Sequence, residues 1–199
     1  MRVLIACEYS GVVREAFNAY SGVYALSCDL LPPEDGRVDF HYQGDVRDII
    51  NDGWDMMIAF PPCTDLAVSG AKWFKEKRAD GRQQAALDFV RLLMDAPIER
   101  IAIENPIGVI SSQIRKPDQI IQPYHFGHEA TKTTCLWLKN LPPLQHTNVV
   151  GKGERHVTKS GKSLPAWYNL PPSPTRWIER SRTFTGIAQA MAEQWSKHA

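Results

Sequence analysis

The stretch Asp55-Met56-Met57-Ile58-Ala59-Phe60-Pro61-Pro62-Cys63-Thr64 decides how the rest of this sequence is organised. Residues 55–59 are mostly apolar and predict a short buried strand. The two prolines lack the backbone N–H that a central strand needs, so the strand must end there. Cys63 therefore lies at the carboxyl end of the strand, the edge where open α/β sheets bind ligands. It is either a candidate nucleophile or a small buried hydrophobe, as free cysteines often are.

Strands and helices alternate along the chain on both sides of this stretch. We expect strands at 2–7, 22–29, 39–43, 55–59, 100–103, 119–124 and 134–138, and helices at 12–20, 46–51, 81–95 and 186–197. The apolar face of the helix at 81–95 is predicted to contain Ala85, Ala86, Phe89, Leu92 and Leu93. Residues 64–80 show neither the alternating pattern of a strand nor the spacing of a long helix, so we predict a mobile loop there. The alternation predicts an α/β fold, a mostly parallel sheet with helices on both faces.

Length and composition narrow the class of protein. A chain of 199 residues with 43% hydrophobic and 23% charged residues is typical of one globular domain, with or without a small appendage. No apolar run approaches the roughly 20 residues that span a membrane, and the first residues are soon too acidic for a signal peptide. We therefore expect a cytoplasmic location. The four scattered cysteines (Cys7, Cys28, Cys63 and Cys135) predict neither a metal site nor a disulfide framework.

Positive charge is concentrated near the end of the chain. The net charge is +1, but residues 145–182 hold seven basic and two acidic residues, so this segment is +5 and the remainder is −4. The basic residues are Lys152, Arg155, Lys159, Lys162, Arg176, Arg180 and Arg182, with Trp167, Tyr168 and Trp177 among them. Basic and aromatic side chains together suit phosphate contact and base stacking. A solvated surface loop would have a similar charge pattern.

Acidic residues follow two of the predicted strands. Asp29 ends the second strand and Asp45 the third, while Ser10-Gly11 follows the first. In a doubly wound sheet, an acid after the second strand is placed to bind ribose hydroxyls, and a glycine turn allows close approach of a ligand. Together the three positions predict an adenosine-containing ligand. Taken singly, each aspartate is better explained as a helix N-cap.

Glu104 ends the next apolar strand and is a candidate partner for Cys63. A thiolate could add to a flat, electron-poor ring while a neighbouring carboxylic acid hydrogen-bonds a ring nitrogen. Burial would raise the pKa of Glu104 and keep it a donor. The alternative is that Glu104 caps the turn that follows it.

Two motifs form an ordered pair: Phe60-Pro61-Pro62-Cys63-Thr64 with Ser69-Gly70, and Ile103-Glu104-Asn105-Pro106 about forty residues later. Tyr9-Ser10-Gly11-Val12 and Gly44-Asp45-Val46-Arg47-Asp48 precede them, and Thr183-Phe184-Thr185-Gly186-Ile187 follows. In order and spacing these segments resemble the motifs of the DNA cytosine-5 methyltransferase family. The resemblance covers residues 1–140 and, more loosely, the final helix. Val13 stands where the family has a glycine, and Lys132 and Thr134 stand in place of two arginines.

The resemblance implies a Rossmann-like fold, S-adenosylmethionine as cofactor and no metal. The cofactor contacts that it implies are Tyr9, Ser10, Gly11, Val12, Asp29, Leu30, Asp45, Val46, Phe60 and Pro61. The catalytic residues that it implies are Cys63, Glu104, Asn105 and Lys132. The expected substrate contacts are Pro62, Thr64, Ser69, Lys72, Lys75, Lys132, Thr134, Arg155, Lys159 and Trp167.

The implied reaction is methyl transfer to carbon 5 of a cytosine that is flipped out of double-stranded DNA. In this scheme Cys63 attacks carbon 6, and Glu104 holds ring nitrogen 3 and the exocyclic amine. Asn105 would brace the loop that carries Cys63. Residues 64–80 would close over the base.

The expected domain organisation is a catalytic domain of residues 1–144 and 183–199, with 145–182 replacing a long target-recognition domain. Compact phage-type members share this layout, which implies a bacterial or phage-infected cell and a target of two bases or fewer. Three alternatives stay open: a free cytosine nucleotide as substrate, RNA as substrate, or an idle cofactor- or DNA-binding protein of the same fold. Oligomeric state is not specified by the sequence.

Overall fold

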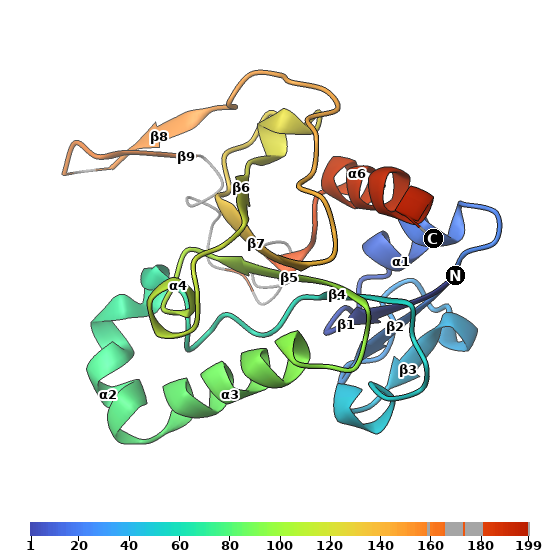
Figure 1. The fold of residues 1–199 in the computed structure, drawn as a ribbon. Coiled ribbons are helices and arrows are strands. Elements are labelled where there is room, and N and C mark those ends of the chain that lie inside the picture. Colours follow the sequence, from blue (N-terminus) through green and yellow to red (C-terminus); the bar gives the residue numbers. More distant parts are fainter. Residues whose placement is uncertain (159, 166–172, 174–180, 199) are drawn as a thin grey trace.

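A computed structural model describes residues 1–158, 160–165, 173 and 181–198. Its described part contains a seven-stranded sheet with the strand order β3-β2-β1-β4-β5-β7-β6 (Figure 1). The strands are β1 (Arg2–Ala6), β2 (Tyr24–Asp29), β3 (His41–Gln43), β4 (Met56–Ala59), β5 (Arg100–Pro106), β6 (Gln119–Ile121) and β7 (Thr134–Lys139). The first five are parallel, whereas β7 is antiparallel to both β5 and β6. The mostly parallel α/β sheet is confirmed.

Helices cover both faces of the sheet (Figure 1). The α-helices are α1 (Val12–Asn18), α2 (Phe74–Ala79), α3 (Arg82–Met94), α4 (Ile110–Gln113) and α6 (Thr185–Trp195). Short 3-10 helices are η1 (Val38–Phe40), η2 (Val46–Asp48), η3 (Val68–Trp73), η4 (Pro123–His125) and η6 (Ser196–His198). The helices predicted at 12–20, 81–95 and 186–197 are therefore present, whereas the helix predicted at 46–51 is only the short 3-10 helix η2.

Each face of the sheet has its own hydrophobic core. Leu4, Met57 and Ile101 pack under α3, with Leu87, Val90 and Leu93 from that helix. On the opposite face, Val3, Ile5, Met56 and Ile58 pack against α1 and α6. Successive residues of β1 and β4 are thus buried on alternate faces, which is why these strands are apolar throughout rather than alternating. The central strand is fixed between two layers, and its carboxyl end is held in place.

The segment 64–80 and the buried face of α3 differ from the sequence predictions. Residues 64–80 were expected to be a loop, but η3 and α2 occupy most of this segment, since helices of one or two turns have too few residues to show a period. The apolar face of α3 is rotated from the prediction, because Ala85 and Leu92 are exposed. The buried stripe includes the polar residue Gln83, whose amide donates to the Asp65 carbonyl at 3.1 Å.

The segment 145–182 contains a separate hairpin. Strands β8 (Arg155–Val157) and β9 (Ser163–Pro165) pair antiparallel and project away from the main sheet (Figure 1). Two-stranded hairpins are marginally stable alone. Among the described residues, no helix is long and apolar enough to cross a membrane.

Candidate active site

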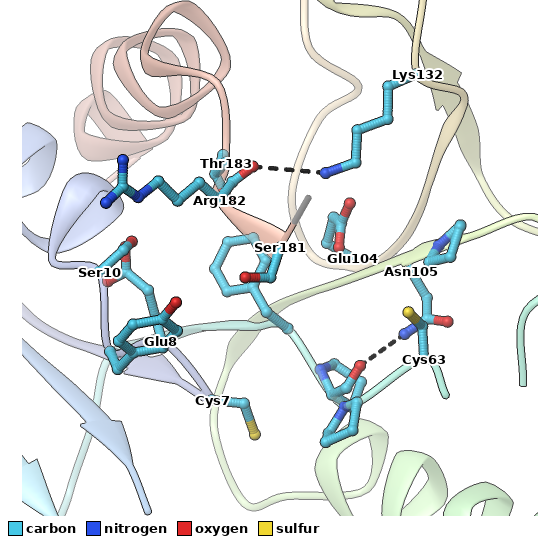
Figure 2. Close-up of a pocket in the computed structure, with 15 residues that line it drawn as sticks. Cys7, Glu8, Ser10, Cys63, Glu104, Asn105, Lys132, Ser181, Arg182 and Thr183 are labelled. Carbon is cyan, nitrogen blue, oxygen red and sulfur yellow. Dashed lines mark hydrogen bonds between the residues drawn. The ribbon is translucent and has the colours of Figure 1, made fainter. Parts of the chain in front are cut away.

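A cleft runs along the carboxyl edge of the parallel strands. It consists of two adjoining cavities, because Cys7 and Pro62 line both. The first cavity, shown in Figure 2, is lined by Cys7, Glu8, Tyr9, Ser10, Phe60, Pro61, Pro62, Cys63, Glu104, Asn105, Pro106, Lys132, Ser181, Arg182 and Thr183. The second is lined by Cys7, Cys28, Asp29, Leu30, Gly44, Asp45, Val46, Arg47, Pro62 and Phe89. Segments from the whole length of the sequence meet here, as strand topology predicts.

Cys63 lies on a fixed turn at the end of β4. The strand stops at Ala59, Pro61 is buried, and Cys63 is exposed to the cleft. The Cys63 carbonyl accepts hydrogen bonds from the Leu66 and Ala67 amides at 3.0 and 2.9 Å. The exposed position excludes the alternative that this cysteine fills the core.

Asn105 ties the Cys63 segment to the neighbouring strand. Its Nδ2 donates to the Pro61 carbonyl at 2.8 Å, and the side chain is buried (Figure 2). This hydrogen bond is the contact through which Asn105 would brace the Cys63 segment, as expected. The strand predicted at 100–103 is longer than expected, since β5 continues through Pro106 because β7 pairs with this end of it.

Glu104 faces the same cavity as Cys63, from the adjacent parallel strand. Burial raises the pKa of Glu104, while the Lys132 ammonium and a hydrogen bond from Thr134 oppose that rise. In Figure 2 the Lys132 side chain extends toward Glu104, and its Nζ donates to the Arg182 carbonyl at 3.5 Å. The raised pKa favours a protonated carboxyl that can donate a hydrogen bond.

The second cavity gathers the acids that follow β2 and β3. Asp29, Leu30, Asp45 and Val46 all line it, as the sequence predicted. Asp45 also caps η2, because its carboxylate accepts a hydrogen bond from the Arg47 amide at 2.9 Å. The same residue therefore both caps η2 and lines the cavity. Asp29 accepts from the Leu31 amide at 3.0 Å. Each carboxylate is oriented by the backbone that follows it.

The turn after β1 provides only two of its four predicted cofactor contacts to the cavities, and one residue that was not predicted. Tyr9 and Ser10 line the first cavity, whereas Gly11 and Val12 do not line either cavity; Gly11 precedes α1 with a φ of +75°. Glu8, which was not among the predicted site residues, is buried at the cavity wall. Its Oε1 accepts from the Val13 amide at 2.8 Å and from the Ser10 hydroxyl at 3.0 Å. Burial raises the pKa of Glu8.

Cys7 and Phe89 were also missed. Cys7 follows β1 with a left-handed φ of +59°, which is uncommon for a residue with a side chain and is often found at functional sites. Burial raises the pKa of the Cys7 thiol, so this group is a neutral part of the wall. Phe89 is supplied by α3 and adds an aromatic ring to the second cavity. The position of Cys7 and Glu8 at a strand end was the only sequence signal for them.

Residues 181–183 form part of the wall of the first cavity (Figure 2). Arg182 forms an ion pair with Glu34, and Tyr9 lines the same cavity as Ser181. This places the residues just before α6 beside the turn that follows β1.

Several predicted substrate contacts lie outside the cleft lining. Thr64, Ser69, Lys72 and Lys75 are exposed on the segment after Cys63, and Arg155 is exposed on the β8–β9 hairpin. Thr134 is buried and reaches the site through Glu104. Lys159 and Trp167 lie outside the described residues. These substrate contacts stay predictions.

No protein-family model and no curated protein matches the sequence. Among solved structures, the chain resembles the methyltransferase EhMeth of Entamoeba histolytica, with 16% identity and a TM-score of 0.51 over 78% of this chain and 58% of that one. Other similar structures are the S. pombe Dnmt2 methyltransferase (19% identity, TM-score 0.48, 72% of this chain and 51% of that one) and a Salinibacter ruber RNA methyltransferase solved with S-adenosyl-L-homocysteine (12%, 0.37, 74% and 86%). The first comparison, together with the sheet, confirms the Rossmann-like methyltransferase fold; this chain spans 58% of that protein.

Proposed function

We propose that this protein transfers a methyl group from S-adenosylmethionine to carbon 5 of cytosine in DNA, through a covalent bond to Cys63. The observation that carries the proposal is the shared cavity of Cys63 and Glu104. They come from adjacent strands, and their cavity adjoins the one lined by Asp29 and Asp45. A thiol, a buried carboxyl group and the two strand-end aspartates thus lie along one edge of the sheet.

The residues of the second cavity fit the proposed cofactor. Asp29 offers carboxylate oxygens to ribose hydroxyls, Asp45 offers an acceptor to the adenine amino group, and Phe89 offers an apolar surface. Glu8 lines the first cavity, and a positively charged amine or sulfonium bound there would favour its carboxylate form and so oppose the effect of burial. When bound, S-adenosylmethionine supplies an electrophilic methyl group.

The proposed chemistry uses side chains from both strands. The Cys63 thiolate adds to carbon 6 of cytosine, which makes carbon 5 nucleophilic. Protonated Glu104 donates to ring nitrogen 3 and stabilises the charge that develops there. After carbon 5 is methylated, water removes its proton and Cys63 leaves as the thiolate. Asn105 maintains the Cys63 turn through Pro61 during these steps.

DNA is proposed as the partner because exposed basic side chains lie on the segment that follows Cys63 and on the β8–β9 hairpin. Lys72 and Lys75 make no ion pair with a described residue, and Lys72 lies 4.9 Å from the centre of the exposed Trp73 ring. Arg155 and Lys162 are exposed on the hairpin. Lys159 and Trp167 are proposed to extend this surface. Basic and aromatic groups together suit an unstacked strand.

The segment 145–182 is proposed to act as a reduced target-recognition unit. Because it is so short, we expect recognition of two bases or fewer, as in a compact phage-type enzyme of the bacterial cytoplasm. Bisulfite sequencing of DNA from cells that express the protein measures the target length. A recognition site of four or more bases would contradict this part of the proposal.

The substrate class is tested by methyl incorporation from labelled S-adenosylmethionine. Duplex DNA, single-stranded DNA, RNA and dCMP are compared at equal cytosine concentration. We expect duplex DNA to be the best substrate and Cys63→Ala to abolish incorporation while calorimetric cofactor binding persists. Cys135→Ala is the matched control, since Cys135 is buried outside the cleft lining. Faster incorporation into RNA or dCMP would contradict the proposal that DNA is the substrate.

A further inference from the structure

Helix α2 carries a buried lysine that contacts the segment after Cys63. The Lys77 side chain is 7% exposed, although its neighbours Glu76 and Arg78 are exposed. Its ammonium donates to the Thr64 carbonyl and lies 3.1 Å from Asp65 Oδ1. Both partners directly follow Cys63 in the sequence. A side chain that is normally solvated is thus directed at the backbone next to the candidate nucleophile.

The contact belongs to a set that fixes the downstream half of the Cys63 turn. The buried Gln83 amide donates to the Asp65 carbonyl at 3.1 Å, from the first turn of α3. The Ala67 region is bridged to Gly108 by bonds of 3.0 Å (Val68 amide to the Ile107 carbonyl) and 2.9 Å (Val109 amide to the Leu66 carbonyl). Lys77 is the charged member of this set.

Burying a charged pair costs free energy, and an apolar residue of similar shape is often at least as stabilising. General stability therefore does not explain why a lysine occupies this position. An ammonium does offer several donors from one point, and here it reaches one carbonyl and one carboxylate in consecutive residues. Its consequence is to fix the backbone geometry of Thr64 and Asp65.

We propose that Lys77 is a positioning residue that holds the Cys63 turn from its downstream side. Asn105 fixes the same turn from upstream through the Pro61 carbonyl. Cys63 is thereby held between two buried polar contacts, and its thiol direction is set before substrate binds. The role in catalysis rests on the proposed function, whereas the fixing of the turn does not.

The test is Lys77→Met, which keeps an unbranched side chain and removes the ammonium. We expect amide hydrogen exchange at Leu66 and Ala67 to accelerate by about tenfold or more, while exchange at Met57 and Ile58 in β4 is unchanged. We expect kcat to fall by about a hundredfold with the cofactor KM within about twofold. Arg82→Met is the control, because it breaks only exposed ion pairs with Glu76 and Asp80.

The exchange arm separates this proposal from the proposed function. If the wild-type protein methylates no nucleic acid but Lys77→Met still accelerates Leu66 and Ala67 selectively, Lys77 positions the turn and the proposed reaction is wrong. Unchanged exchange at these amides would overturn the positioning role whatever the activity. If Lys77→Met does not fold, Asp65→Asn weakens the same contact and is expected to produce a smaller selective acceleration; equal acceleration throughout β4 would contradict it.

Discussion

Gly108→Ala perturbs the Cys63 segment from a residue that has no chemistry of its own. A Cβ on Gly108 would lie 2.2 Å from the Leu66 carbonyl oxygen and 2.9 Å from its carbon, both backbone atoms. Close carbon–oxygen contacts are about 3.3 Å, so the segment must move by roughly 1 Å. Such overpacking costs about 2 kcal/mol of unfolding free energy, which lowers Tm by about 4–8 °C in a chain of this size.

The same movement displaces Cys63, because its carbonyl accepts from the Leu66 and Ala67 amides. A displacement of about 1 Å at a reacting group can lower kcat by about a hundredfold. Thermal unfolding and single-turnover methyl transfer measure the two effects. Gly70→Ala is the control, since its Cβ would meet its nearest neighbours at 3.5 and 3.6 Å, an ordinary contact distance. Equal Tm and kcat for Gly108→Ala and the wild type would refute the reasoning.

Three other predictions concern the site residues. Because burial raises the folded-state pKa of Glu104 above its ordinary value of 4.5, its contribution to stability is complete below that pH and is lost as pH rises. Glu104→Gln should therefore gain thermal stability relative to the wild type between pH 5 and pH 8, by at most about 1.4 kcal/mol per pH unit; a constant difference would contradict this. Iodoacetamide at pH 8 should alkylate exposed Cys63 before Cys28 and Cys135, whose pKa values burial raises to about 12 and about 11, as peptide mass spectrometry can determine. Earlier labelling of Cys28 would be incompatible with the structure. Asn105→Ala should lower the unfolding free energy by about 1–3 kcal/mol and reduce kcat, because the Pro61 carbonyl loses its donor, whereas Gln145→Ala removes only an exposed contact with the Pro143 carbonyl and should change denaturant stability little.

The sequence was sufficient for the parts of the fold that depend on local pattern. The apolar run at 55–59 and the two prolines after it predicted where β4 ends, and the acids after β2 and β3 predicted the second cavity. These inferences succeed because a parallel sheet brings all its carboxyl ends to one edge. The neighbouring positions of Cys63 and Glu104 follow from the same rule.

The remaining features depend on pairings that local pattern does not specify. β5 extends through Glu104 and Asn105 because β7 returns antiparallel beside it, and the sequence of β5 alone gives no sign of that partner. Gln83 and Lys77 are polar, so their burial is evident only once their contacts with Asp65 are seen. The buried face of α3 was predicted incorrectly for the same reason, since the buried stripe of this helix includes Gln83. Glu8 was missed because its role comes from the cavity rather than from its neighbours in the sequence.

The central claim is that Cys63 forms a covalent bond to cytosine, and adduct trapping tests it most directly. A DNA duplex that contains 5-fluorocytosine is incubated with the protein and S-adenosylmethionine, then analysed by denaturing electrophoresis and intact mass. Fluorine at carbon 5 blocks release of the cysteine. We predict a cofactor-dependent adduct with the mass of protein, DNA and one methyl group, and its absence in Cys63→Ala. Methyl transfer to ordinary DNA with no adduct, or an adduct that persists in Cys63→Ala, would contradict the claim.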